Sequence, residues 1–183
     1  MKSEFSDGPV RGGLWMGELP PCIFKSDLVL SEEVIYSKDI VPGDSHQESI
    51  AGIEFFTHRG PRVLYGCVGG TYKPMTDMDG VKIEVRYLDQ FVDKCQTPLA
   101  SGAGDSYIGL EKNYAEAVLS GIKTALQNGA DLLPGVIIIN AGAISKLASA
   151  PIIYERLGER ICDALSLIAI GKYVSDNVFK LGL

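Results

Sequence analysis

The chain has 183 residues, of which 46% are apolar and 22% are charged, and this composition excludes a disordered or collagen-like protein. The length is typical of one compact domain with a real core. Lys and Arg together number 17 against 23 Asp and Glu, so the net charge of −6 argues against nucleic acid as a partner.

The start of the chain has no apolar core behind a basic residue, so we expect no signal peptide. No apolar run reaches the roughly 18 residues of a membrane span, so a membrane partner is not expected either. The four cysteines, Cys22, Cys67, Cys95 and Cys162, are scattered and have no Cys-x-x-Cys spacing. We interpret them as reduced thiols of a cytoplasmic protein without a structural metal site.

Residues 1–21 are rich in Gly, Pro and Ser and end in Pro20-Pro21. This pattern predicts an extended or flexible arm, followed by a single globular domain over residues 22–183. Trp15 lies within the arm, and a lone Trp usually packs somewhere, on this subunit or on a neighbour.

The next part of the chain predicts strands, because β-branched and aromatic residues recur there between turn signals. In Val81–Tyr87 apolar and charged residues alternate, which indicates a strand with one wet face. Short connections favour an antiparallel meander. The expected strands are Cys22–Leu30, Val34–Ser37, Ile53–Thr57, Arg62–Val68 and Val81–Tyr87.

The pattern becomes helical after Asp105, with one apolar stripe from Leu110 to Leu126. Val136–Ile139 is apolar on both faces and predicts a buried central strand that ends at Asn140-Ala141-Gly142. Strands first and helices later indicate an α+β fold, with α/β as the alternative.

A final long helix is expected over residues 151–181, with Pro151 in its first turn. From Ile161 to Ile170 it is apolar nearly all round. Such a helix needs more cover than a small domain readily gives, so we expect a symmetric homo-oligomer.

The glycine-rich segment Ser101–Ser106 precedes the first expected helix. Backbone N–H groups at such a position bind anions, so Gly102, Gly104 and Ser106 are candidate substrate-binding residues for a phosphate or carboxylate. Asp105 has two possible roles, a helix N-cap or a catalytic general base.

Residues 102–106 resemble the Gly-Ala-Gly-Asp loop of ribokinase-like sugar and nucleoside kinases. Arg62–Val68, Gly69-Gly70 and Val81–Val85 are similar to the strands that precede that loop, so the likeness spans about a quarter of the chain. It is a local likeness. It implies that the glycines form an anion hole and that Asp105 is the base.

The loop Val41–Glu48 contains His46, one of the two histidines, and the other is His58. With Asp44 they could form a metal site or an acid–base pair if the fold brings them together, and two solvated loop histidines are the alternative. We keep His46 as a catalytic candidate and expect no metal. The sequence does not tell which cofactor, if any, the protein uses.

Asn140, at the expected end of the buried strand, could donate its amide to a substrate, or serve only in a turn. Two functions follow. The first is a small cytoplasmic enzyme that binds a small anionic molecule at the glycine-rich loop. The second is a non-catalytic, self-assembling structural or interaction protein.

Overall fold

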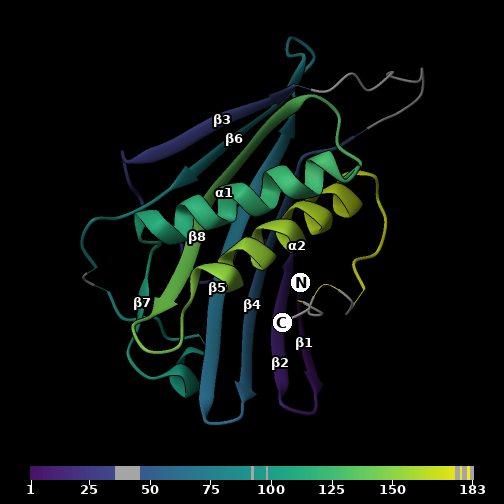
Figure 1. Ribbon diagram of the computed structural model, residues 1–183. Helices are drawn as coiled ribbons and strands as arrows, with labels where there is room; N and C mark the ends of the chain where they lie inside the picture. Colours follow the sequence, from purple (N-terminus) through teal and green to yellow (C-terminus); the bar gives the residue numbers. More distant parts are fainter. Residues whose placement is uncertain (36–45, 92, 98, 176–177, 179–180, 182–183) are drawn as a thin grey trace.

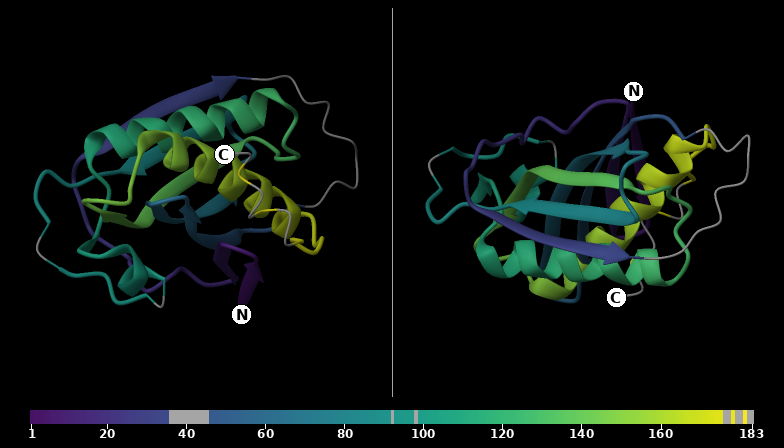
Figure 2. Two further views of the ribbon diagram at one scale, coloured as in Figure 1. Left: turned by 60° about the horizontal axis from the view of Figure 1, so that its bottom comes forward. Right: turned by 90° about the horizontal axis from the view of Figure 1, so that it is seen from above.

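The computed structural model describes residues 1–35, 46–91, 93–97, 99–175, 178 and 181. These residues form a mixed β-sheet with two helices packed on one of its faces (Figures 1 and 2). The α+β prediction is therefore confirmed. The strands of the described residues are β1 (Lys2–Asp7), β2 (Val10–Met16), β3 (Val29–Ile35), β4 (Ser49–Arg59), β5 (Arg62–Pro74), β6 (Gly80–Arg86), β7 (Ser106–Ile108) and β8 (Gly135–Ser145).

The strand order in the sheet is β1-β2-β4-β5-β8-β6-β3, and β7 extends the pairing at the far end of β8. The neighbours from β1 to β8 are antiparallel, and so are β6 and β3, whereas β6 and β8 run parallel. The expected meander is thus interrupted, because β3 leaves the chain order and pairs at the opposite edge of the sheet.

The structure corrects the prediction of an extended or flexible arm over residues 1–21. Residues 2–16 form the β1–β2 hairpin, and β2 pairs along its whole length with β4. Trp15 packs within its own subunit and is only 5% exposed. Glycine and serine lowered the apparent strand propensity, but the pairing of β2 with a long buried neighbour outweighs that local preference.

Two predicted strand boundaries also change. Residues 22–28 are not a strand, because only Ile23 makes an isolated bridge, to Ala141, before β3 begins at Val29. The expected strand over 34–37 belongs to β3 as far as Ile35, and residues 36–37 lie outside the described part of the chain. The expected strands over 53–57 and 62–68 are confirmed within β4 and β5, and the one over 81–87 is confirmed within β6 as far as Arg86.

The first predicted helix is confirmed as α1 (Lys112–Gln127), and the last one begins at Pro151 as expected. That helix, α2 (Pro151–Ala169), is shorter than predicted. Gly171 follows it with a φ of 71°, a left-handed conformation that ends a helix. The nearly all-apolar segment is covered mainly by α1, β4 and β5 of the same chain.

The helices α1 and α2 cross closely because glycines meet backbone at the contact (Figure 1). A Cβ atom at Gly121 would overlap the carbonyl oxygen of Glu155, and one at Gly158 would overlap that of Val118. The two glycines therefore allow each helix to lie against the bare backbone of the other.

The strand β8 carries a β-bulge at Asn140. Gly70 pairs with Ile139 and Gly69 with Ala141, so Asn140 is the extra residue. A one-residue insertion switches the face to which later side chains point. Ile137 and Ile139 therefore pack in the helix-side core, whereas Ala141 and Ala143 pack on the other face.

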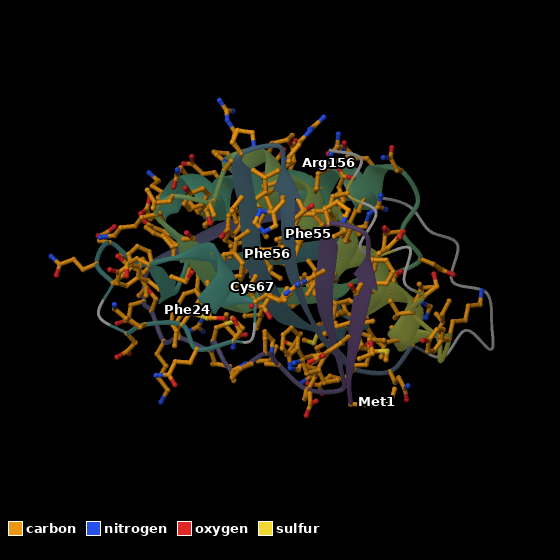
Figure 3. The ribbon with its side chains drawn as sticks, turned by 90° about the horizontal axis from the view of Figure 1, so that it is seen from below. Met1, Phe24, Phe55, Phe56, Cys67 and Arg156 are labelled. Atoms are coloured by element: carbon orange, nitrogen blue, oxygen red, sulfur yellow. The ribbon has the colours of Figure 1, made fainter. Side chains whose placement is uncertain are left out.

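We call the side away from α1 and α2 the outer face. Residues 19–24 cross it, with Pro20 packed where Gly52 and Gly69 leave room. Residues 93–97 and 99–103 also cover it, and Ala100 and Ala103 join Cys22, Phe56 and Cys67 in a second apolar cluster. Phe56 and Cys67 lie close together in Figure 3. No helix in the described part of the chain is long and apolar enough to cross a membrane.

Candidate functional site

A buried carboxylate stands in the outer face. The pairing of β1, β2, β4 and β5 places Glu4, Gly13, Glu54 and Cys67 in one row across the sheet. Glu54 is 1% exposed, which is unusual for a glutamate. Burying an ionised carboxylate without a paired cation costs several kcal/mol, so this position calls for an explanation.

Hydroxyl groups satisfy one oxygen of that carboxylate. The Tyr65 hydroxyl donates to Glu54 Oε1 at 3.1 Å, and the Thr97 hydroxyl donates to the same oxygen. Glu54 Oε2 is buried and has no hydrogen-bond partner among the described residues. An acceptor left without a donor marks a group whose partner is either a proton or a ligand.

Burial raises the pKa of Glu54 above its ordinary value of 4.5, because removal from water disfavours the charged form. The hydrogen bonds from Thr97 and Tyr65, the charge of Lys2 and the backbone N–H of Ala100 oppose this rise only in part. Burial likewise raises the pKa of the Tyr65 hydroxyl and of the Cys95 thiol, so both stay neutral donors at neutral pH.

A hollow of about 390 Å³ opens in front of this group, and we call it the Glu54 pocket; its lining includes Lys2, Glu4, Arg11, Gly13, Glu54 and Leu99. Gly13 keeps it open. A Cβ atom there would stand 3.7 Å from Glu54 Oε2 and 3.1 Å from the Trp15 ring. Any larger side chain at Gly13 would fill the space beside the free carboxylate oxygen.

The charges in this lining favour an anion when Glu54 is protonated. Lys2 and Arg11 then give two positive charges against the one of Glu4, which leaves 2 − 1 = +1. Lys2 pairs with Glu4 at 2.8 Å and lies 5.3 Å from the centre of the Trp15 ring. The Lys2 ammonium lowers the pKa of Glu4. The two carboxyl groups of the pocket are thus pushed in opposite directions, a pattern found where an acid and a base work together.

The glycine-rich loop does not lead directly into a helix. A 3₁₀ turn, η1 (Ala100–Ala103), is followed by β7, which pairs with the end of β8, and the N-cap of α1 is Glu111. Asp105 therefore caps no helix, which corrects that prediction. Its carboxylate is 65% exposed and pairs with Lys94 at 3.2 Å.

The other loop residues have structural contacts. The Ser106 hydroxyl donates to the carbonyl oxygens of Ala100 and Gly104, at 3.2 and 3.3 Å. Gly104 has a φ of 81°, and Gly102 lies against the Phe56 ring. Gly102 and Gly104 also line a hollow of about 610 Å³ that includes Arg62.

The two catalytic candidates, His46 and Asp105, lie at opposite ends of β8. His46 Nε2 is 3.2 Å from the carbonyl oxygen of Asp131, which precedes the first residue of β8. The carbonyl oxygen of Asp105 accepts from the backbone N–H of Lys146, which follows the last residue of β8. The ends of this 11-residue strand are roughly 30 Å apart. Asp44 lies outside the described residues.

His58 is the last residue but one of β4, and His46 lies before its start, so these histidines do not converge either. No cluster of three metal-ligating side chains occurs in the portions that the structure describes.

Asn140 was expected at the end of the buried strand, but it lies within β8. Its backbone carbonyl accepts from Phe24 N–H at 3.0 Å. Its side-chain Oδ1 is buried without a partner among the described residues. Asn140 does not line the hollow at Gly102 and Gly104, so the two predicted binding elements do not form one pocket.

Glu54 is not among the site residues predicted from the sequence. One signal was present, since Glu54 is a charged residue inside the apolar run Ile53–Phe56. A charge in such a run is either exposed on a wet face or buried for a purpose. The strand pairing that places Gly13 opposite Glu54 could not be derived from the sequence, because residues 2–16 were predicted to be an arm and not strands.

No protein-family model, curated protein or solved structure matches this chain. These comparisons therefore add no support to the local likeness between residues 102–106 and the kinase loop. Function has to be argued from the site itself.

Proposed function

We propose that this protein is a small cytoplasmic enzyme that acts on an anionic metabolite bound in the Glu54 pocket. The carrying observation is the free Glu54 Oε2, buried beside a hollow that has two cations in its lining. With Glu54 protonated the lining carries a net charge of +1, which matches a small carboxylate of charge −1.

Each group has a role in this proposal. Lys2 and Arg11 hold the anionic group of the substrate, and the protonated Glu54 donates a proton or a hydrogen bond from Oε2. Tyr65 and Thr97 are positioning residues, because their hydroxyls donate to Oε1 and so fix the carboxyl through its other oxygen. Glu4, kept ionised by Lys2, is the candidate base.

Titration calorimetry with acetate, succinate and glycerol phosphate tests the binding step. We expect one of these anions to bind the wild-type protein and to bind Gly13→Val at least tenfold more weakly, because the added side chain fills the pocket. Arg11→Met should weaken binding by a similar factor, whereas Lys25→Met, an exposed lysine outside the pocket, should not.

Equal binding by wild type and Gly13→Val would contradict this location. Failure of all three anions to bind would contradict the proposed substrate class. A tight ligand that requires Arg62 in place of Arg11 would instead favour the glycine-rich loop.

The hollow at Gly102, Gly104 and Arg62 supports a second candidate site, which keeps the anion at the glycine-rich loop with Asp105 beside it. Arg62→Met is the direct test. It should abolish anion binding if this hollow is the site and leave binding unchanged if the Glu54 pocket is.

Self-assembly is the alternative from a different class. Trp15 and the apolar α2, which motivated it, are covered within the chain. Its present support is the edge strand β3, where Val29 and Ile35 are 38% and 74% exposed. Native mass spectrometry of Ile35→Lys tests a homo-oligomer formed there. A loss of the oligomeric mass would support self-association, and a monomeric wild type would contradict it.

The proposed compartment is supported by the free thiols, which are typical of a reducing environment.

A further inference from the structure

Two cysteines that are distant in sequence meet on the outer face of the sheet. Cys22 Sγ and Cys67 Sγ are 3.3 Å apart, and both side chains are fully buried. Cys67 lies in the middle of β5, opposite Glu54 in the register with β4. Cys22 belongs to residues 19–24, the segment that crosses the outer face.

The backbone holds Cys22 in this position. Gly142 N–H donates to the carbonyl oxygen of Cys22 at 3.0 Å, and Phe24 N–H donates to that of Asn140 at 3.0 Å. Both bonds involve the part of β8 at or just after the bulge, where the chain has changed face. The two thiols therefore approach each other through a defined local pairing and not through a chance contact of mobile side chains.

We propose that Cys22 and Cys67 are an oxidisable dithiol that forms an intramolecular disulfide with hydrogen peroxide as oxidant. One thiolate attacks the peroxide and gives a sulfenic acid, with cleavage of the O–O bond and release of water. The second thiolate attacks that sulfur, the S–S bond forms, and a second water leaves. Two thiols lose two hydrogens and two electrons in total, and the peroxide accepts them.

The reaction depends on local opening. Residues 17–28 carry few backbone bonds to the sheet, so this segment can separate from β8 at lower cost than the strands beneath it. Burial raises the pKa of the Cys67 thiol well above its ordinary value, so thiolate is scarce at neutral pH. We expect the reaction to be slow at pH 7 and faster at pH 9, since the thiolate is the nucleophile.

The other two cysteines serve as controls. Cys162 lies in α2 on the opposite side of the sheet. Cys95 Sγ is 3.4 Å from the Thr97 hydroxyl and 3.8 Å from the Tyr65 hydroxyl, and its side chain packs against the apolar cluster that contains Cys22 and Cys67. Among the hydrogen bonds of the described residues, neither Cys95 nor Cys162 contacts another thiol.

The experiment treats the folded full-length protein with hydrogen peroxide at pH 7 and pH 9, then alkylates it under denaturing conditions. Intact mass and peptide mapping follow. The expected product has lost two hydrogens, keeps two alkylatable thiols, maps to a 22–67 cross-link and is reversed by dithiothreitol. It also melts at a higher temperature, because the cross-link restricts the unfolded chain.

The single variants Cys22→Ser and Cys67→Ser should form no intramolecular cross-link, whereas Cys95→Ser and Cys162→Ser should form it as the wild type does. The proposal is overturned if all four thiols remain alkylatable at pH 9, or if the cross-link maps to Cys95. It is also overturned if the cross-link appears only after denaturation. None of these outcomes depends on whether the Glu54 pocket binds an anion.

Discussion

The two faces of the sheet are built differently. The face under α1 and α2 is an apolar core in which glycines bring backbone against backbone. The outer face has a smaller apolar cluster and beside it a carboxyl, a phenol and a hydroxyl in mutual hydrogen bonds. The burial of apolar side chains is sufficient to explain the core under the helices. Packing does not explain why a carboxyl group, that of Glu54, is buried in the outer face, and this difference makes the outer face the candidate functional region.

Gly121→Val should produce the largest loss, because the added side chain overlaps the Glu155 carbonyl and forces α1 and α2 apart. We expect the free energy of unfolding to fall by about 3 kcal/mol, the upper part of the overpacking range. Urea denaturation measures it. The matched variant Ser120→Val, at the exposed neighbouring position, should change stability by less than about 0.5 kcal/mol. Equal losses would mean that the helices do not cross at Gly121.

Tyr65→Phe removes one of the two donors to Glu54 Oε1 on the outer face. We expect a loss of about 1–2 kcal/mol in unfolding free energy, typical of a buried hydrogen bond to a polar group. Tyr114→Phe is the control, because its hydroxyl makes only a long 3.4 Å bond to the Ser149 carbonyl and is partly exposed. Thermal denaturation at pH 5 compares them, and a smaller loss for Tyr65→Phe would contradict the proposed cluster.

The pH dependence of stability should separate wild type from Glu54→Gln. Because the pKa of Glu54 is raised on folding, the folded state binds more protons between 4.5 and the raised value. The contribution of Glu54 to the free energy of unfolding is therefore fully present below pH 4.5. It is lost as the pH rises from 4.5 to the raised pKa, by about 1.4 kcal/mol for each unit of difference between the two pKa values.

Urea denaturation from pH 4 to pH 8 measures this difference. Glu54→Gln should lose less stability than wild type over the range, and the exposed Glu48→Gln should follow the wild type. Burial also raises the pKa of Asp163, which affects all three proteins alike and cancels in the comparison. Parallel curves for wild type and Glu54→Gln would contradict an elevated pKa.

Asp105→Asn should have the smallest effect. Its ion pair with Lys94 is more than half exposed at both ends. Such surface pairs contribute about 0–1 kcal/mol. We expect a melting temperature close to that of the wild type and unchanged anion binding in the Glu54 pocket. A large loss of binding would move the site to the glycine-rich loop.

Elements with strong periodicity were predictable from the sequence. The stripe of α1 and the alternation of Val81–Val85 record which side of each element faces the core. The hairpin of residues 2–16 was not, because its strand state depends on pairing with β4 and not on local propensity. The bulge at Asn140 was equally hidden, since Asn and Gly indicate turns and bulges alike.

The candidate site was harder to predict than the fold. The glycine-rich loop attracted attention because helix starts bind anions, but Ser106–Ile108 pairs with β8 and the helix begins later. The Glu54 pocket depends on a row of residues from four strands, which no local spacing reveals. The one signal of this pocket in the sequence is the charged residue Glu54 inside the apolar run Ile53–Phe56.

A pH titration of the Glu54 carboxyl carbon by NMR, with Glu54→Gln to assign the resonance, tests directly whether this buried carboxyl has an elevated pKa. We expect a signal that is absent from the variant and titrates with a midpoint above 4.5, the ordinary value for glutamate. A midpoint at or below that value would mean that Glu54 is ionised like a surface carboxylate, and the outer face would lose its claim to be the functional site.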